Sequence, residues 1–289
     1  MNKQRQHHSE DGYSLKRAAS IRDFIDCQEL QKLVWGMNEL DIIPVHLLRV
    51  WADGGGLVLN AYSDAQRPIG TTISFPLKYA GRPVLYSHMT GVLRKYHNKG
   101  IGLALKLNQR EFALNEGFEL ICWTYDPLRS QNNWFNLNKL GAIARNYYAN
   151  YYGNLDARLY RGLNSDRILA EWWVKSPRVK KRLKLKVKPK TTQTLILNET
   201  KPRNGMRRPW RKPNLQATGR GLRIEIPTHI EQSQDEDLSG LKRWRRDTRQ
   251  LYSHYFNRGY IATATETDEV TKCTFIRLER GPLQRILRN

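Results

Sequence analysis

A short glycine loop carries the clearest chemistry in the sequence. It comprises His97, Asn98, Lys99, Gly100, Ile101 and Gly102, and it lies between a segment patterned like a strand and one patterned like a helix. Backbone N–H groups that converge at a helix N-terminus attract anions, because the helix dipole adds to their partial charge. Glycine also lets the backbone approach a ligand without a Cβ. The context predicts a phosphate-binding loop, whereas an isolated Gly-x-Gly is more often an ordinary tight turn.

Two side chains on the strands either side of this loop and its helix are candidates for catalysis, one as a general base and one as a group that orients the acceptor. His88 lies on the preceding strand segment, and since an unperturbed histidine titrates near about 6.5, it is a candidate general base for an amine or hydroxyl acceptor. The alternative is a histidine packed in the core or on the surface. Asp126 ends the following strand and is a candidate for orienting an acceptor amine, or else it caps the turn before Pro127.

Hydrophobic periodicity predicts the elements that position these residues. Ser20 and Asp23 resemble an N-cap and an N3 acid, which predicts a first helix over 20–35. The further predicted elements are a helix over 45–51, strands over 56–63, 68–79 and 83–93, a helix over 103–117, a strand over 119–125, and a helix over 132–140. Short turns join the three consecutive strands into an antiparallel meander, and the strand, helix and strand that follow predict a parallel crossover. The fold class is therefore α/β with a mixed sheet.

The loop and its flanks resemble the GNAT superfamily of acyltransferases. The family signature is Arg or Gln, two residues, Gly, one residue, and Gly or Ala, directly after the fourth strand. Gly100 and Gly102 match it, His97 stands where the family has Arg or Gln, and Lys99 can still supply positive charge. The resemblance extends over 57–173 and is strongest to a poorly characterised bacterial branch of predicted acetyltransferases.

This resemblance implies acetyl-CoA as co-substrate, a small-molecule amine or hydroxyl as acceptor, and no metal. Val92 and Leu93 fall where the family offers strand backbone to the pantetheine amides and to the developing oxyanion. Asn132 and Asn133 are implied polar contacts to the coenzyme. Many members carry a tyrosine that protonates the departing thiolate, and this chain has Leu137 there. Either another group, such as Tyr125 or Tyr147, supplies the proton, or the thiolate leaves without a protein acid. The departures at His97 and Leu137 also leave open a GNAT-like fold that binds coenzyme A without turnover.

The distribution of charge suggests a second possibility for the acceptor. The chain has 49 Lys and Arg against 27 Asp and Glu, and 17 of the basic residues lie in 175–223, where Glu199 is the sole acid. Such a stretch binds nucleic acid or forms a solvated linker. Trp210 could stack on RNA, but one tryptophan is not a stacking platform, so nucleic acid is not the favoured partner. Alternating residues predict an edge strand over 182–188, and 201–214 is predicted to be a flexible loop.

The predicted domain plan follows from these patterns. A tail over 1–19 precedes an acyltransferase domain over 20–173, a basic edge strand and linker over 174–223, and a small α+β extension over 224–289. The extension contains a helix over 241–256 and two strands around Asp268. The sequence is compatible with three roles for this extension: a lid, a homodimer contact or part of the acceptor site.

The remaining composition is that expected of a cytoplasmic protein. Three separated cysteines, with no CxxC pair and no histidine cluster at ligand spacing, read as reduced thiols rather than a metal site. Neither a signal-peptide pattern nor an apolar run of membrane-spanning length is apparent, so no membrane association is expected.

Overall fold

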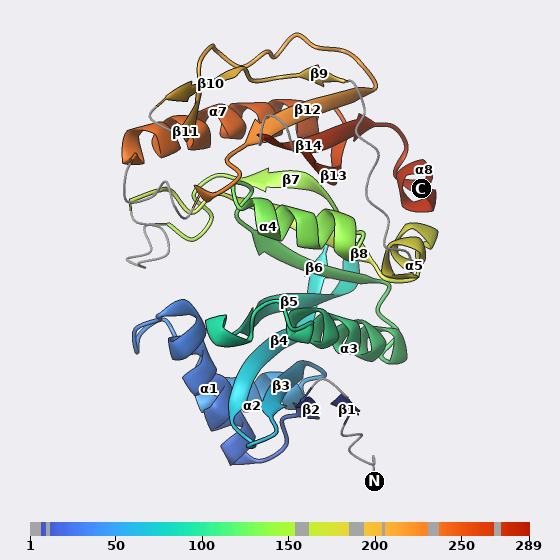
Figure 1. The fold of residues 1–289 in the computed structure, drawn as a ribbon. Helices are drawn as coiled ribbons and strands as arrows, with labels where there is room; N and C mark the ends of the chain where they lie inside the picture. Colours follow the sequence, from blue (N-terminus) through green and yellow to red (C-terminus); the bar gives the residue numbers. More distant parts are fainter. Residues whose placement is uncertain are drawn as a thin grey trace. The chain divides into compact units, whose positions relative to one another are not determined.

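The computed structural model describes residues 7–9, 12–153, 162–184, 194–203, 206–230, 237–268 and 273–289. The chain forms two compact units, Met1–Trp123 and Thr124–Asn289. The division falls within one strand, Leu120–Tyr125, and it cuts the 20–173 segment that the sequence patterns group as one domain. Figure 1 shows the elements of each unit.

The first unit contains the helices and strands predicted over 20–125 in the predicted order, preceded by two strands in the segment predicted to be a tail. They are β1 (His7–Ser9), β2 (Tyr13–Arg17), α1 (Ile21–Trp35), α2 (Val45–Asp53), β3 (Leu57–Ser63), β4 (Pro68–Tyr79), β5 (Arg82–Val92), the 3-10 turn Arg94–Tyr96, α3 (Ile101–Asn115) and β6 (Leu120–Tyr125). The strands follow one another across the sheet from β1 to β6. The meander β3–β4–β5 is antiparallel, and β6 runs parallel to β5, which confirms the predicted strand, helix and parallel strand.

The start of α1 follows from its cap. The Ser20 side chain accepts from the Asp23 N–H while the Asp23 carboxylate accepts from the N–H groups of Ser20 and Ala19, so the predicted capping box is present. The same carboxylate also accepts from Lys16 Nζ of β2 at 2.6 Å. Residues 13–17 are therefore a strand paired with β3 rather than part of a tail, since that pairing satisfies their backbone groups.

The sheet of the first unit is covered on both faces. On β3, Leu57, Leu59 and Ala61 belong to a buried cluster with Ile101 and Leu105 of α3. Val58, between them, belongs to a second cluster that contains Phe24 of α1 and Leu48 of α2. Because successive residues of a strand point to opposite faces, α3 covers one face and α1 and α2 the other (Figure 1).

The second unit contains further strands of the same twelve-stranded sheet, together with helices and a separate two-stranded sheet. They are the short helix α4 (Ser130–Asn133), which continues as a π-helix over Trp134–Lys139, β7 (Ile143–Tyr148), β8 (Arg167–Trp173), α5 (Pro177–Lys184), β9 (Leu195–Ile196), β10 (Thr200–Arg203), β11 (Met206–Pro209), β12 (Gly221–Ile226), α7 (Leu238–Asn257), β13 (Tyr260–Asp268), β14 (Cys273–Arg280) and α8 (Leu283–Arg288). The strand order is β8, β7, β13, β14, β12, β9, and β10 pairs with β11 separately.

Three expectations for this half of the chain are corrected. Residues 182–184 belong to α5, because the buried Val179 and Arg178 anchor that helix, and 185–188 lie outside the described residues. The 201–214 loop instead contains the β10–β11 hairpin. The segment after 224 is not a separate appendage: β13 pairs with β7, and Ile261 and Ile286 share a buried cluster with Ile143.

None of the helices in the described ranges is both long and apolar enough to cross a membrane. The same ranges contain no group of three or more His, Cys, Asp or Glu side chains arranged to hold a metal ion.

Candidate functional site

The strands β5 and β6 form a short parallel ladder and then separate. Their paired residues are Leu85 with Ile121 and Tyr86 with Cys122. From Ser87 to Val92, β5 continues along β4 beyond this ladder. One edge of the Ser87–Val92 segment therefore pairs with β4, and its other edge lies past the last paired residues of β5 and β6. The segment ends shortly before the glycine loop.

The direction of each backbone group along this segment follows from antiparallel pairing with β4. The Leu93 N–H donates to the Ile69 carbonyl at 2.9 Å, so Leu93 turns its backbone toward β4. In an antiparallel pair the backbone groups of alternate residues point to opposite sides. Val92 and Thr90 therefore turn theirs to the side away from β4, which corrects the expectation for Leu93 and adds Thr90 in its place.

The glycine loop joins this edge to the start of α3. Asn98 and Gly100 adopt left-handed backbone conformations, with φ of 62° and 77°. Gly100 is the N-cap of α3, and no side chain caps the helix there. The first N–H groups of a helix lack intrahelical acceptors, and the first turn of α3 carries no acid to compete for them. A helix N-terminus of this kind can receive an anion, and phosphate binding by the loop stays a prediction.

The space in front of Gly102 is open. A Cβ built at this glycine would have Val92 Cγ2 as its nearest heavy atom, 4.0 Å away, and its φ is not in the left-handed region. Neither packing nor backbone conformation within the protein therefore requires glycine here. A ligand that approaches the backbone closely would require it.

His97 contacts the strand rather than the helix. Its Nε2 lies 2.9 Å from the Val92 carbonyl oxygen, on the edge of β5 that faces away from β4. The contact requires the tautomer in which Nε2 carries the proton. A carbonyl oxygen has two lone pairs, so Val92 retains capacity for a second donor.

His88 lies at an irregularity in β5. Ile73 pairs with Met89 and the next residue, Ser74, pairs with Ser87, so His88 is the extra residue of a β-bulge. Bulges re-aim side chains and are frequent beside active sites. The half-buried ring contacts Trp51 of α2 edge-on at 5.7 Å and lies near Phe75 and Tyr86. Burial lowers the pKa of His88 below 6.5, which keeps the ring neutral at pH 7.

Asp126, in the second unit, is engaged in an ion pair. Both carboxylate oxygens accept from Arg245, at 2.8 and 2.7 Å, and Oδ1 also accepts from the Leu128 N–H. Burial raises the pKa of this carboxyl, but the charge and hydrogen bonds of Arg245 outweigh it, and the net pKa is lowered. A buried carboxylate held on three sides suits capping of the turn, so the structure does not support the predicted role in orienting an acceptor amine.

The other residues predicted near α4 differ in accessibility. Tyr125 is buried and donates to Asn133 Oδ1 at 3.1 Å, and its burial raises its pKa well above 10. Asn133 is fully buried, and its amide donates to the carbonyls of Pro127 and Arg129. Asn132 is exposed. Tyr147 donates to Asp166 and stacks on Tyr252, so of these side chains Asn132 alone presents an accessible polar group.

One functional candidate was missed by the sequence analysis. Lys106 of α3 is 3% exposed, and its Nζ donates to Ser87 Oγ at 3.0 Å and to Gln109 Oε1 at 2.8 Å. Its position within the buried stripe of α3, beside Leu105 and four residues after Gly102, was the available signal. A lysine in a helix is usually exposed, so the pattern alone did not single it out.

Comparisons with known proteins give partial matches. Neither a protein-family model nor a curated protein matches the sequence. An aminoglycoside acetyltransferase from an uncultured soil metagenomic sample is 20% identical, with a TM-score of 0.38, over 43% of this chain and 84% of that chain. A GNAT-family acetyltransferase from Elizabethkingia anophelis with acetyl-CoA bound is 16% identical (TM-score 0.43; 57% and 99% covered). The ribosomal-protein-S5-alanine acetyltransferase from Vibrio fischeri is 14% identical (TM-score 0.47; 59% and 97% covered). The similarity is one of fold, over about half of this chain.

Proposed function

We propose that the protein is an acyl-CoA-dependent acyltransferase that moves an acetyl group to an amine or hydroxyl of a small molecule. The observation that carries this proposal is the end of the β5–β6 ladder at Tyr86 and Cys122, followed along β5 by a glycine loop that leads into an uncapped helix N-terminus. Such an arrangement offers a ligand the backbone groups of one strand edge and, next along the chain, the N–H groups of a helix N-terminus. Coenzyme A has the matching parts, a pantetheine arm with two amides followed by a pyrophosphate.

The residues of the first unit fit these parts in order. The N–H groups at the start of α3 would hold the pyrophosphate, and the open space at Gly102 admits it. The exposed Lys99 adds positive charge beside the loop. The backbone of Val92 and Thr90 would bind the pantetheine amides as an added strand. Bound acetyl-CoA supplies an activated thioester.

Proton removal from the acceptor is assigned to His88. Its ring is neutral at pH 7 because burial lowers its pKa, so its free nitrogen can take a proton from an acceptor ammonium or hydroxyl. The neighbouring Trp51 and Phe75 provide apolar surface for the acceptor on the face covered by α2. The Thr90 N–H, turned away from β4, would stabilise the negative charge that develops on the thioester oxygen.

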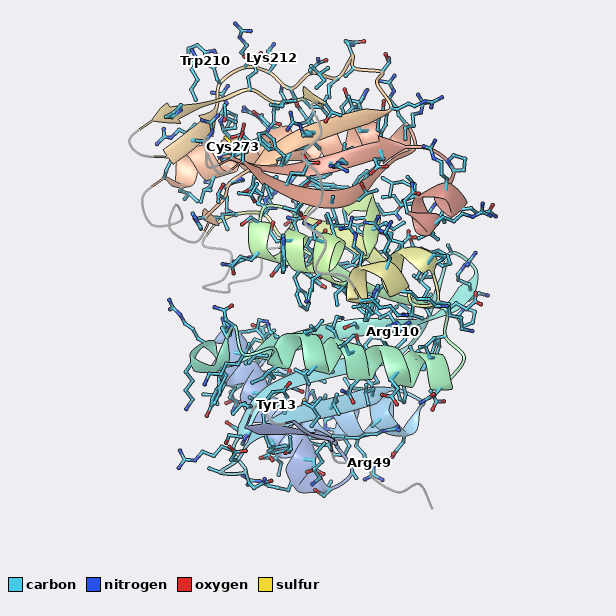
Figure 2. All side chains as sticks on the ribbon, turned by 45° about the vertical axis from the view of Figure 1, so that its right-hand side comes forward. Tyr13, Arg49, Arg110, Trp210, Lys212 and Cys273 are labelled. Atoms are coloured by element: carbon cyan, nitrogen blue, oxygen red, sulfur yellow. The ribbon has the colours of Figure 1, made fainter. Side chains whose placement is uncertain are left out.

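A second candidate, in which the acceptor is RNA or a ribosomal component, has one observation in its favour. The second unit holds 34 Lys and Arg against 15 Asp and Glu. Trp210 is 52% exposed, and Lys201 Nζ lies 3.8 Å from its ring centroid. Figure 2 shows Trp210 and the neighbouring Lys212 at the outer margin of this unit. An exposed tryptophan among cations is a feature of single-strand binders.

The test of the proposed function is thiol release from acetyl-CoA. The purified protein is incubated with acetyl-CoA and a panel of small amines, alcohols, peptides and RNA, and free thiol is measured over time. Acceptor-dependent release with any member supports the transferase proposal and identifies the acceptor class. Binding of coenzyme A without release across the panel would indicate a non-catalytic sensor instead.

A further inference from the structure

The buried Lys106 lies where β5 and β6 part. Ser87 and Trp123 are the residues that directly follow the last ladder pair, Tyr86 with Cys122. The Lys106 Nζ contacts both of them, donating to Ser87 Oγ at 3.0 Å and lying 3.8 Å from the centroid of the Trp123 ring. The amine therefore spans the two strands at the apex of their opening.

This placement is built by a buried polar network. Gln109 Nε2 donates to Ser87 Oγ and to Thr72 Oγ1, and the Thr72 hydroxyl lies 2.7 Å from that of Thr90. Lys106, Ser87 and Gln109 are each at most 3% exposed. Burial of a lysine is costly unless its polar head is held, and the network holds it in one position. The network extends along β5 to Thr90, the residue proposed to face the thioester.

We propose that Lys106 donates the proton that neutralises the coenzyme A thiolate as it departs. This inference rests on the proposed function. A pantetheine arm paired with Val92 and Thr90 places its sulfur beyond the second amide, about one strand residue, roughly 3.3 Å, further toward the apex. The group at the apex on the α3 side is the Lys106 amine. His88 belongs to the face covered by α2, so the base and the acid would act from opposite sides of the sheet.

The acceptor nitrogen forms a bond to the acetyl carbon and its proton passes to His88, while the C–S bond breaks and its electron pair stays on sulfur. One N–H proton moves from the Lys106 ammonium to that sulfur. The lysine is left as a neutral amine and regains a proton from water. Burial lowers the pKa of Lys106 to about 7, so both of its forms are accessible near neutral pH.

The test compares coenzyme A with desulfo-coenzyme A, which lacks the sulfur, by calorimetry at pH 7.5. The step leaves a neutral coenzyme A thiol beside the neutral Lys106 amine, where the S–H can donate a hydrogen bond to Nζ that desulfo-coenzyme A cannot make. We expect wild-type protein to bind coenzyme A about fivefold more tightly than desulfo-coenzyme A, the gain of one such hydrogen bond. Lys106→Met should bind the two ligands equally. Glu111→Met, at an exposed position of the same helix, should keep the preference.

The outcomes separate this inference from the proposed function. Equal affinities in the wild type, or a preference that persists in Lys106→Met, would overturn the role of Lys106 while leaving the donor site intact. An acetyl group found on Lys106 by mass spectrometry would also overturn it, since the lysine would then accept the acyl group. If folded wild-type protein binds neither coenzyme A nor desulfo-coenzyme A, the proposed function itself is wrong. If Lys106→Met fails to fold, the wild-type comparison alone still decides against the inference when the affinities are equal.

Discussion

His88 is the residue on which the proposed proton removal depends, and its environment sets its pH behaviour. Because burial lowers its pKa below 6.5, we expect kcat/KM for the acceptor identified by the panel to fall at acidic pH, as the ring is protonated, whereas the fall above pH 7 would belong to the Lys106 ammonium, whose pKa is about 7. His88→Gln should lower kcat by about 10²–10⁴-fold and remove that acid limb. Thiol-release rates from pH 5 to 8 provide the measurement. An unchanged acid limb in the variant would assign the titration to another group.

The residues of the site were predictable where their roles depend on the backbone. The glycine loop, Val92 and His88 were singled out from a strand, a loop and a helix in sequence, and the structure has that order, with Val92 and His88 on β5 and the loop before α3. Their roles stay predictions. Lys106 and the engagement of Asp126 depend on which side chains meet across the fold. Arg245 is far from Asp126 in the sequence, so no local pattern predicts their ion pair.

At the scale of single elements, the capping box of α1 gives a prediction for stability. Asp23 is buried, accepts from two backbone N–H groups and pairs with Lys16. Asp23→Ala should lower the free energy of unfolding by about 1–2 kcal/mol, because it removes a cap and a partly buried ion pair. Chemical denaturation of the variant beside Glu29→Ala, whose carboxylate is exposed, checks the difference. Equal losses in the two variants would argue against a special role for the cap.

The same carboxylate makes stability depend on pH. Although burial alone would raise it, the hydrogen bonds from Lys16, Ser20 and Ala19 lower the pKa of Asp23 from 3.8 to about 2. The fold therefore favours the ionised form, and this contribution is complete above about pH 4 and is lost as the pH falls toward 2. Wild-type protein should lose more stability than Asp23→Ala over that window.

Elements with a local signature were predictable, and those that depend on distant contacts were not. The capping residues fixed the start of α1, and turn residues marked the meander. The strand prediction for 182–184 was wrong because these residues alternate between basic and apolar, as in a strand. In the structure Arg178 donates to the carbonyls of Gly141 and Leu137 and so holds α5 in place. Those acceptors come from an earlier part of the chain, so the alternation alone could not reveal the helix.

For the molecule as a whole, the excess of positive charge lies in the second unit. If RNA carries the acceptor, Lys201→Glu with Lys212→Glu should weaken binding of single-stranded RNA and flatten its dependence on salt concentration, because each phosphate contact contributes to that slope. Fluorescence anisotropy at several salt concentrations measures both. Acetyl-CoA affinity should stay unchanged, since the proposed donor site uses residues of the first unit. Lys78→Glu, in the first unit, is the matched control.

The donor site is tested most directly by titrating the protein with acetyl-CoA by calorimetry, beside Gly102→Gln and Gly102→Glu. Both substitutions replace a helical glycine, and the glutamate also complements the N-terminal dipole of α3, so neither should lower stability. We predict micromolar binding by the wild type, weaker binding by Gly102→Gln, and a further loss of about tenfold or more in Gly102→Glu, because its carboxylate repels the pyrophosphate. Equal binding by all three folded proteins, or none by the wild type, would contradict the proposal that this loop holds coenzyme A.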